Sequence, residues 1–498
     1  MPVVAIPAFS AAIGSFVRWQ MSRTRSALSP RAPFDLSRAP PFAIRFDLLN
    51  ACLIFFMLLP LLACHERLPL QERWNVVLVV LDAARADHFG SYGYARDTTP
   101  VADAFAARST RYETVISEAP FTFLATSSLF SAGSPAVTGL VGHAGGIVPE
   151  SLHLIAETAR DHGFSTLAYS ENPYVTEDFG LHQGFEVFEE VFPVIVDRRR
   201  RGDGQEIDSV QRLTRLLERA DSREDKPFFL YAHLLRPHNP YAPPAPFAGR
   251  FGSEPRHQRD GHTRTLVALD RAGGPFDSEQ IERIKSLYDE NLAYADSIFG
   301  ALLGSLESRG LNERTIVILT ADHGEAFGEH GRLLHNSQLF DSMLRVPLIV
   351  FVPGQTSGVE QTPIQLADLG RGLQAYFEGE RESDTGLMRL GEARDPEEPL
   401  YSWTNANPHL VAARTESRKL VLDAQTLGVV AYHDLVVDPG EEQPIRMDAE
   451  GMRLRPGIVT KISEWVGIPL PVSHEPMLDA ARRRQLEALG YLEAETAE

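Results

Sequence analysis

The chain has 498 residues, 43% of them hydrophobic and 23% charged, which is the composition of a folded globular protein with room for one large domain and a smaller one. Its formal net charge of -19 disfavours a nucleic-acid partner, because binding to phosphates requires clustered lysine and arginine. The two cysteines, Cys52 and Cys64, lie near the N-terminus, so the remainder of the chain holds no disulfide, no cysteine zinc site and no cysteine nucleophile.

The N-terminal 64 residues are unlike the rest of the chain. Residues 1–47 are rich in arginine, proline and serine, and we expect them to be disordered. Residues 48–64 form an apolar run that is short for crossing a bilayer, which takes about 20 residues, but suits a secretory signal. The run ends in LLAC, which is similar to a bacterial lipoprotein cleavage site with Cys64 as the lipidated residue; an uncleaved anchor is the alternative. Both interpretations predict an exported, membrane-attached protein on the periplasmic or cell-surface side.

Short apolar, β-branched runs then recur along the chain, each followed by polar or turn residues. They cover Val76 to Leu81 before Asp82, Phe228 to Ala232 before His233, Thr315 to Thr320 before Asp322 and His323, and Pro347 to Val352 before Pro353. Helical patterns lie between them, at Ser151 to His162 and Ser278 to Arg309. This alternation predicts an α/β fold with a central, mostly parallel sheet flanked by helices and a crevice at the carboxyl ends of the strands.

The pattern changes beyond about residue 380. Charged loops there separate three strand-like runs, LVAARTES, RKLVLDA and GVVAYHDLV, and a helical pattern follows around Met477 to Leu492. We therefore expect two folded parts, a large domain at residues 74–380 and a small C-terminal α+β subdomain at residues 381–498.

Three residues at strand ends are candidate metal ligands. Asp82, Asp322 and His323 all follow apolar runs, and the carboxyl ends of parallel strands meet at one edge of a sheet. Taken singly, each would be a turn or capping residue; taken together, they predict one divalent metal ion held by oxygen and imidazole ligands. The sequence does not distinguish Ca, Mg, Mn and Zn.

Several motifs resemble the sulfatase family of the alkaline phosphatase superfamily. The segments DHGE, GEHG and RVPLIV between Asp322 and Val350 resemble its metal and core-strand segments, and LDAARADHFGSYGYARDTTP from Leu81 resembles its opening motif. FFLYAHLLRPHNPYAPP from Phe228 is similar to its histidine segment, and LDAARRRQLEALGYLE from Leu478 to its C-terminal helix. The resemblance implies a sulfatase-like sandwich with residues 74–380 as the catalytic domain. It also implies that Asp82, Asp322 and His323 bind the metal.

The resemblance further implies a pocket for an anionic ester group. His233, His238 and His335 would line this pocket, protonated, with one of them protonating the leaving oxygen. Thr122 falls at the family's nucleophile position and would also bind the metal, although threonine before an apolar helical run is also a common helix cap. His330 is expected only to support the loop.

The sequence also departs from the family pattern. Sulfatases carry Cys or Ser in C/S-x-P-x-R, where this chain has Thr122, Leu124 and Thr126, so formylglycine cannot form from a cysteine. The family's second opening aspartate is Ala83 here, and YSENP, which contains Asn172, replaces GKWHLG. Asn172 is expected either in a turn or at the substrate. Arg85 and Asp87 follow Asp82 closely and are expected to support the metal ligands.

Three functions remain open at this point. The first is hydrolysis of sulfate or phosphate esters through a covalent Thr122 intermediate, with phosphate favoured because a plain threonine cannot expel sulfate as a formylglycine hydrate does. The second is transfer of phosphoethanolamine or phosphoglycerol onto an envelope glycan or lipid. The third is an inactive member that binds anionic glycans.

Overall fold

The computed structural model describes residues 73–135, 146–191, 208–222, 226–335, 338–379, 398–404 and 409–467, together with Arg483 and Leu486. The N-terminal segments at 1–47 and 48–64 lie outside the described residues, as does the helix expected around Met477 to Leu492 apart from those two positions. Within the described part, no helix combines the length and the apolar character needed to cross a membrane.

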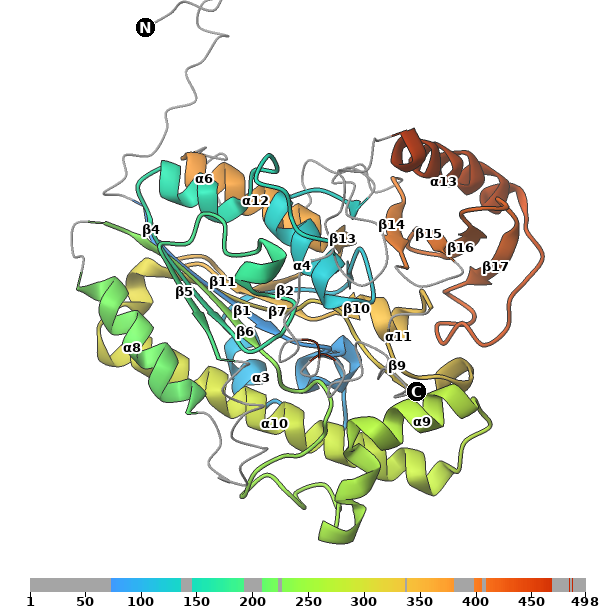
Figure 1. The fold of residues 1–498 in the computed structure, drawn as a ribbon, viewed down its shortest axis with the longest axis horizontal. Helices are drawn as coiled ribbons and strands as arrows, with labels where there is room; N and C mark the ends of the chain where they lie inside the picture. The colour runs from blue at the N-terminus through green and yellow to red at the C-terminus, as the bar shows by residue number, and fades with distance from the viewer. Residues whose placement is uncertain are drawn as a thin grey trace, which may run out of the picture. The chain divides into compact units, whose positions relative to one another are not determined.

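An eight-stranded sheet forms the centre of the fold (Figure 1). Its strands, in spatial order, are β12 (Gly358–Glu360), β2 (Thr110–Tyr112), β11 (Leu348–Phe351), β7 (Thr315–Ala321), β1 (Asn75–Leu81), β6 (Phe228–Leu234), β4 (Ser165–Ser170) and β5 (Val187–Glu190). The strands from β7 to β5 are mutually parallel, whereas β11 runs antiparallel to β7 and β2. The expected α/β fold with a mostly parallel central sheet is confirmed.

The middle of this sheet is buried on both faces. Every residue of β1, β6 and β7 is buried. A strand covered on both faces cannot alternate apolar with polar residues, which explains the continuous apolar runs in the sequence. These strands form the centre of one large hydrophobic core.

Helices cover both faces of the sheet. Figure 1 shows α4 (Thr122–Ser131), α6 (Ile155–Asp161) and α12 (Leu366–Glu378) over one face, and these helices contact one another. Over the other face lie α3 (Pro100–Ala106), α8 (Ser209–Asp221) and the long α10 (Ser278–Ser308), which contacts both. Helix α9 (Thr263–Ala272) precedes α10. The helix expected at Ser278 to Arg309 agrees closely with α10, whereas the one expected from Ser151 begins at Ile155, because Leu154 is extended there.

Short elements shape the chain between the main strands. One small sheet joins β3 (Val115–Ile116), β10 (Arg345–Val346) and β13 (Ile364–Gln365), and another joins β8 (Ala326–Phe327) and β9 (Leu333–Leu334). Helix α11 (Asp341–Leu344) lies between β9 and β10. The one-turn 3-10 helices are Ala86–His88, Gly90–Tyr92, Glu177–Phe179, Asn312–Arg314 and Glu329–Gly331, and a longer one spans Pro255–Gly261. The segments that carry Thr122 and His335 are thus tied to the two small sheets.

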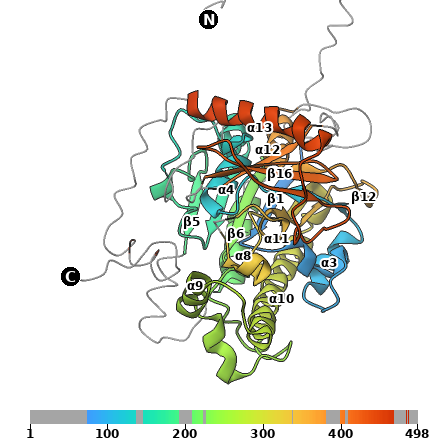
Figure 2. The same cartoon turned by 90° about the vertical axis from the view of Figure 1, so that its right-hand side faces the viewer.

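A separate antiparallel sheet follows residue 398 (Figure 2). It contains β14 (Leu400–Trp403), β15 (Leu410–Arg414), β16 (Arg418–Asp423) and β17 (Val429–Asp434), in that order, and α13 (Ala449–Gly467) packs on it. Three of these strands match the three runs expected in the C-terminal part. Helix α13 was not expected, because Pro456 inside it is normally a helix breaker.

Candidate active site

Polar residues from three neighbouring strands meet because of the register of the sheet. Strand β1 lies between β6 and β7, with Val80 opposite both His233 and Thr320. Asp82 therefore leaves β1 at the same level at which Asp322 and His323 leave β7. The crevice expected at the carboxyl ends of the strands is where these side chains come together.

Asp82, Asp322 and His323 form a compact cluster of possible metal ligands. One ligand atom from each lies within 4.8 Å of the others. His323 Nε2 is 3.8 Å from Asp82 Oδ1 and 3.5 Å from Asp322 Oδ2. Both of these carboxylate oxygens are buried without a hydrogen bond from the described residues. Burial first, and then the repulsion of Asp322, raises the pKa of Asp82, and burial also raises the pKa of Asp322. Two buried carboxylates with unpaired oxygens fit a bound cation, which would remove both penalties.

The imidazole of His323 is oriented for metal binding. Its Nδ1 lies 2.9 Å from the carbonyl oxygen of Gly324, and because a carbonyl only accepts, Nδ1 carries the proton. Nε2 then presents its lone pair to the cluster, as in most histidine metal ligands. Burial lowers the pKa of His323 to about 3, which keeps the ring neutral and able to ligate.

Thr122 lies at the same cluster. Its Oγ1 is 3.2 Å from His323 Nε2, and its hydroxyl opposes the raised pKa values of Asp82 and Asp322. Thr122 is the first residue of α4, whereas the N-cap residue is Phe121. The interpretation of Thr122 as a helix cap is therefore wrong, because its hydroxyl faces the cluster. Its position at a helix N-terminus also favours an anion there.

Asn172 connects Asp82 to Thr122. It follows β4, is fully buried, and its Nδ2 donates to Asp82 Oδ2 and, at 3.4 Å, to Thr122 Oγ1. Its Oδ1 accepts from the backbone N–H of Tyr174 at 2.7 Å, which fixes the orientation of the amide. Asn172 therefore lies in a turn, as expected for an asparagine before proline, and its amide also contacts Asp82 and Thr122.

His238 and His335 face each other across the cluster. Their Nε2 atoms are 3.0 Å apart, and the ring of His335 lies 4.3 Å from that of His323, centroid to centroid. Nδ1 of His238 lies 2.7 Å from the carbonyl of Asn239, and Nδ1 of His335 lies 3.1 Å from the carbonyl of Pro120, so both Nδ1 atoms carry protons. The two facing Nε2 atoms can then hold one proton between them, but not two.

Burial and neighbouring groups lower the pKa of two of these histidines. Burial and the neighbouring His335 lower the pKa of His238 to about 3. Protonated histidines around a bound anionic group stay a prediction, because a nearby negative charge would raise these pKa values. His233 is also held neutral, because burial lowers its pKa. Desolvation therefore opposes a positive charge on His233 and His238 before a ligand binds.

His233 has a different environment from the His238 and His335 pair. Its Nδ1 lies 2.7 Å from the Tyr231 hydroxyl. Its Nε2 lies 3.7 Å from Asp82 Oδ2 and 3.9 Å from Asp322 Oδ2, buried without a hydrogen bond from the described residues. Tyr231 was missed by the sequence analysis, although its place two residues before His233 puts both side chains on one face of β6.

The chain was then compared with known proteins. The family model described as Sulfatase matches residues 74–378, which is more than half of the chain. The chain belongs to the sulfatase family.

Individual relatives are distant. A choline-sulfatase of Rhizobium meliloti is 26% identical over 170 residues, which is 32% of this chain and 33% of that protein, so the chain spans about a third of it. An ulvan-active sulfatase of Formosa agariphila is 24% identical over 429 residues, covering 77% of this chain and 80% of the relative.

Solved structures show the same fold. The phosphonate monoester hydrolase of Agrobacterium radiobacter matches with a TM-score of 0.61 and 20% identity, over 79% of this chain and 95% of that one. A protein solved with its substrate D-glucosamine-2-N,6-O-disulfate matches with a TM-score of 0.59 and 17% identity, over 81% and 99%. At these sequence identities the structural similarity shows a shared fold and nothing about the substrate.

Ala83 stands where the sulfatase pattern has a second aspartate. It adopts a left-handed conformation with φ of 58°, which is uncommon for alanine. Its backbone N–H donates to Asp322 Oδ1 at 3.1 Å, and its carbonyl accepts from the Tyr288 hydroxyl at 2.9 Å. The backbone of Ala83 therefore positions Asp322, and its side chain supplies no ligand.

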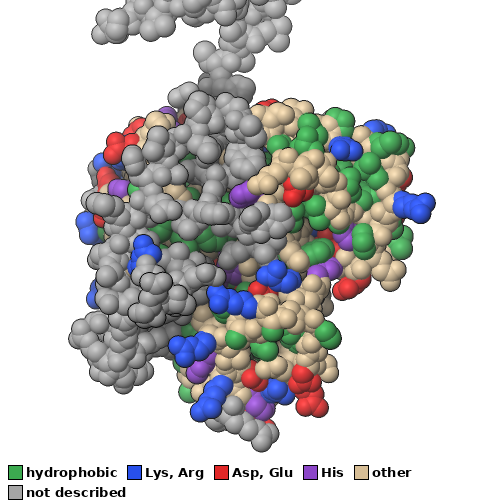
Figure 3. All heavy atoms as spheres, turned by 45° about the vertical axis from the view of Figure 1, so that its right-hand side comes forward, with side chains coloured by type: hydrophobic (Ala, Val, Ile, Leu, Met, Phe, Trp, Pro, Cys, Tyr) green, Lys and Arg blue, Asp and Glu red, His purple; other side chains and the backbone are tan. Residues whose placement is uncertain are grey.

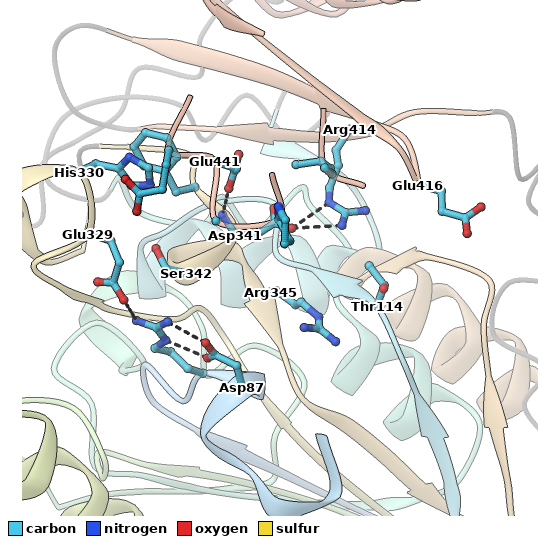
Figure 4. Close-up of a pocket in the computed structure, with 16 residues that line it drawn as sticks. Asp87, Thr114, Glu329, His330, Asp341, Ser342, Arg345, Arg414, Glu416 and Glu441 are labelled. Atoms are coloured by element: carbon cyan, nitrogen blue, oxygen red, sulfur yellow. Dashed lines mark hydrogen bonds and ion pairs between the residues drawn. The ribbon is translucent and has the colours of Figure 1, made fainter. Parts of the chain in front are cut away.

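Arg85 and Asp87 lie beside the cluster, in a neighbouring pocket. Arg85 pairs with both Asp87 oxygens and with Glu329, and its Nη1 also donates to the carbonyl of Glu325, three residues after Asp322. The pocket has a volume of about 430 Å³, and Asp87 and Glu329 are labelled on its wall in Figure 4. Arg85 thus contacts the loop that follows Asp322 and His323, and its support of a metal site stays a prediction.

His330 lines the same pocket rather than the cluster. Its ring stacks on Phe340 with centroids 3.4 Å apart. The far wall comes from the C-terminal sheet and the turn after β17, through Arg414, Glu416 and Glu441 (Figure 4).

Proposed function

We propose that this sulfatase-family chain hydrolyses phosphate or sulfate esters with Thr122 as the nucleophile and a divalent metal ion as cofactor. The supporting observation is the position of Thr122 Oγ1, which lies 3.2 Å from His323 Nε2 within the cluster of Asp82, Asp322 and His323. A hydroxyl buried at two unpaired carboxylate oxygens and an imidazole fits a nucleophile that shares a cation with them. When bound, that cation would lower the pKa of the hydroxyl and offset the charge of the ester group.

In the first step, Thr122 Oγ1 forms a bond to the phosphorus or sulfur atom while the bond from that atom to the alcohol oxygen breaks. Asn172 orients Oγ1 through its amide, and the proton shared by His238 and His335 passes to the leaving oxygen. Thr122 Oγ1 first loses its proton to solvent, so the step consumes the Thr122 alkoxide and the proton of the histidine pair. The product is an alcohol and an esterified Thr122.

In the second step, water attacks the same phosphorus or sulfur atom and displaces Thr122 Oγ1. One proton of the water returns to the Nε2 atoms of His238 and His335, and Thr122 Oγ1 leaves as the alkoxide with which the next cycle begins. The geometry needs no further protein nucleophile. Phosphate is favoured over sulfate because Thr122 has no geminal hydroxyl with which to expel the group, so the ester must be opened by water or another acceptor.

The relatives indicate only the general class of substrate. They include an ulvan-active sulfatase, a phosphonate monoester hydrolase and a protein solved with a disulfated glucosamine. We propose an anionic ester, with a glycan or a lipid head group as the alcohol part. Transfer of a phosphoethanolamine or phosphoglycerol group would differ only in the acceptor that opens the Thr122 ester.

The experiment is mass analysis of the intact protein after rapid quenching. Full-length protein supplied with Ca, Mg, Mn and Zn is mixed with aryl phosphate monoester, aryl phosphate diester or aryl sulfate. We expect a phosphate-containing mass increase on Thr122 and turnover of at least one substrate. Thr122→Ala should lose both, while Thr122→Ser keeps a hydroxyl and should keep part of each.

The outcomes separate the alternatives. Turnover that survives in Thr122→Ala excludes Thr122 as nucleophile. A Thr122 ester that forms without turnover, and that is released when an alcohol is added, favours the transferase. Binding of anionic glycans without ester or turnover favours an inactive member.

We also propose export and membrane attachment through residues 48–64, with Cys64 lipidated. Fatty-acid labelling of cells that express the full chain tests this. Cys64→Ser should lose the label, and Cys52→Ser, within the same apolar run, should keep it. Label that persists in Cys64→Ser excludes the lipoprotein form, and membrane fractionation of that variant then tests for an uncleaved anchor.

A further inference from the structure

Tyr231 and His233 lie next to each other on one face of β6. Side chains two residues apart in a strand point to the same side, and both of these are fully buried. The Tyr231 ring packs edge-on against Phe130 of α4, with ring centroids 4.8 Å apart, and beside Phe185. This packing fixes the Tyr231 hydroxyl at 2.7 Å from His233 Nδ1.

The surroundings of Nε2 decide which nitrogen of the neutral His233 ring carries the proton. Nε2 lies 3.7 Å from Asp82 Oδ2 and 3.9 Å from Asp322 Oδ2. Two carboxylate oxygens attract a protonated Nε2, whereas they repel a lone pair in the same place. Nδ1 must then accept a hydrogen bond, and the Tyr231 hydroxyl is the group that donates it.

This tautomer is the reverse of that of the other site histidines. His323, His238 and His335 each place Nδ1 against a backbone carbonyl, which only accepts, so each carries its proton on Nδ1. A hydroxyl can donate as well as accept, so Tyr231 permits His233 to carry its proton on Nε2 instead. His233 is therefore a hydrogen-bond donor at the cluster that needs no positive charge.

The Nε2–H group of His233 has no acceptor within the described part of the chain. It is buried, and neither carboxylate oxygen is close enough for a hydrogen bond. A buried N–H without an acceptor is destabilising, so this group fits an oxygen atom that arrives with a ligand. The proposed substrate carries such atoms, namely the non-bridging oxygens of its phosphate or sulfate group.

We infer that Tyr231 is a positioning residue, which holds His233 in the tautomer that donates Nε2–H to a non-bridging oxygen of the bound ester. The inference deepens the proposed function and rests on it for the identity of the ester. Loss of the Tyr231 hydroxyl frees the ring to carry its proton on Nδ1, and the Nε2 lone pair then repels the ester oxygen. Because the donor contacts that oxygen before and during the reaction, it contributes to binding more than to the chemical step.

Nuclear magnetic resonance tests the tautomer directly. Full-length protein labelled with ¹⁵N-histidine gives distinct signals for protonated and unprotonated ring nitrogens, and the His233 signals are those lost in His233→Gln. We expect a protonated Nε2 in wild type and a large share of protonated Nδ1 in Tyr231→Phe. Tyr376→Phe removes another buried hydroxyl, which hydrogen-bonds the Trp74 backbone, and should match wild type. A wild-type His233 protonated on Nδ1, or an unchanged tautomer in Tyr231→Phe, overturns the inference.

Phosphate binding and kinetics test the contact with the ester. Inorganic phosphate, titrated into protein supplied with Ca, Mg or Zn, should move the His233 Nε2 signal, and Tyr231→Phe should bind phosphate about tenfold more weakly. For an aryl ester, KM should rise by a similar factor while kcat stays within about threefold. In a His233→Gln background, Tyr231→Phe should change neither constant, because no ring remains to orient. An Nε2 signal that phosphate does not move, or equal effects of Tyr231→Phe in both backgrounds, contradicts the inference.

These readouts are separate from the Thr122 mass experiment. The tautomer and the phosphate signal need no turnover, so a protein that shows both but forms no Thr122 ester refutes the proposed nucleophile and not the role of Tyr231. Circular dichroism checks that each variant folds. If Tyr231→Phe does not fold, the tautomer of wild-type His233 and its response to phosphate decide the inference.

Discussion

In the proposed mechanism, His238 and His335 act together as a single proton donor. Both Nδ1 atoms are committed to backbone carbonyls, so the proton between the two Nε2 atoms, 3.0 Å apart, is the one that can move. Burial and His335 lower the pKa of His238 to about 3, so the charge of the bound anionic ester would be needed to stabilise the shared proton. Loss of either ring would therefore remove the acid for the leaving oxygen while leaving the metal cluster and Thr122 in place.

The dependence of the rate on the leaving group tests the role of the two histidines as the acid. In His238→Asn, kcat/KM for an alkyl phosphate should fall by about 10²- to 10⁴-fold, because an alkoxide needs a proton to leave. A p-nitrophenolate group leaves without a proton, so kcat/KM for a p-nitrophenyl phosphate should fall by less than about tenfold. Steady-state kinetics on the two substrates measures the difference. His330→Asn is the matched control, because that ring stacks on Phe340 outside the cluster. Equal losses on both substrates would contradict the acid role.

Some site residues could be found from the sequence and others could not. Asp82, Asp322 and His323 follow apolar runs directly, so the rule that parallel strands end at one edge places them together. Asn172 and Tyr231 carry no such signal: a buried asparagine hydrogen bond depends on β4 lying two strands from β1, which only the folded sheet reveals. The lowered pKa of His238 carries no sequence signal either, because burial and the neighbouring His335 cause it.

At the scale of elements, helix α4 must approach α12 closely to place Thr122. A Cβ atom on Gly370 of α12 would lie 2.2 Å from the backbone carbonyl of Leu129 in α4. Gly304 lies in the interior of α10 with nothing within 4 Å of its Cβ position. Both glycines thus lie within helices, but a side chain at Gly370 would meet the backbone of α4, whereas one at Gly304 would meet open space.

Alanine at these two positions should act in opposite directions. Gly304→Ala should stabilise the protein by up to about 1 kcal/mol, because alanine is the better helix former. Gly370→Ala should destabilise it by about 1–3 kcal/mol, because the backbone of α4 must move away. Denaturant unfolding measures both. If Gly370→Ala were stabilising, α4 and α12 could move apart without a loss of free energy of unfolding, and the close contact would not be required.

Elements were predictable where one physical rule decided them. β1, β6 and β7 are buried on both faces, so their apolar runs identify them. Helix α13 was missed because Pro456 argues against a helix, and packing on the C-terminal sheet outweighs that local cost. Strand β14 was also missed, since its four residues, Leu400–Trp403, are too few to show a period.

At the scale of the molecule, the C-terminal sheet is tied to the catalytic part by buried charge. Lys419 of β16 is fully buried and pairs with Asp341 of α11 and with Glu441, at 2.5 Å and 2.7 Å. Two residues of α11, Ser342 and Met343, accept the backbone N–H groups of Glu325 and Gly324, next to His323. The C-terminal sheet thus supports the turn that carries the candidate metal ligands. The turn after β17 exposes Val436 and Val437. Figure 3 shows hydrophobic and charged side chains intermixed on the face that it draws.

Removal of the Lys419 charge should therefore be costly. Lys419→Met leaves Asp341 and Glu441 buried without their cation, and we expect a loss of about 3–5 kcal/mol in the free energy of unfolding. Lys461→Met is the matched control, because Lys461 pairs with Glu464 on the surface. This variant should lose only about 0–1 kcal/mol in the free energy of unfolding. Urea unfolding at neutral pH measures both. Similar losses in the two variants would contradict the role of buried charge.

The pH dependence of that loss gives an independent test. Burial alone would raise the pKa of Asp341, but Arg414 and Lys419 outweigh it and hold the pKa below its usual value. A depressed carboxyl pKa stabilises the fold above the unfolded-state value, near 3.9, and this contribution disappears as the pH falls through the folded-state value. As unfolding is repeated from pH 7 down to pH 2, the difference between wild type and Lys419→Met should therefore stay flat to about pH 4 and shrink below it. A difference that stays constant over this range would mean that Lys419 acts through packing of its side chain rather than through its charge on Asp341.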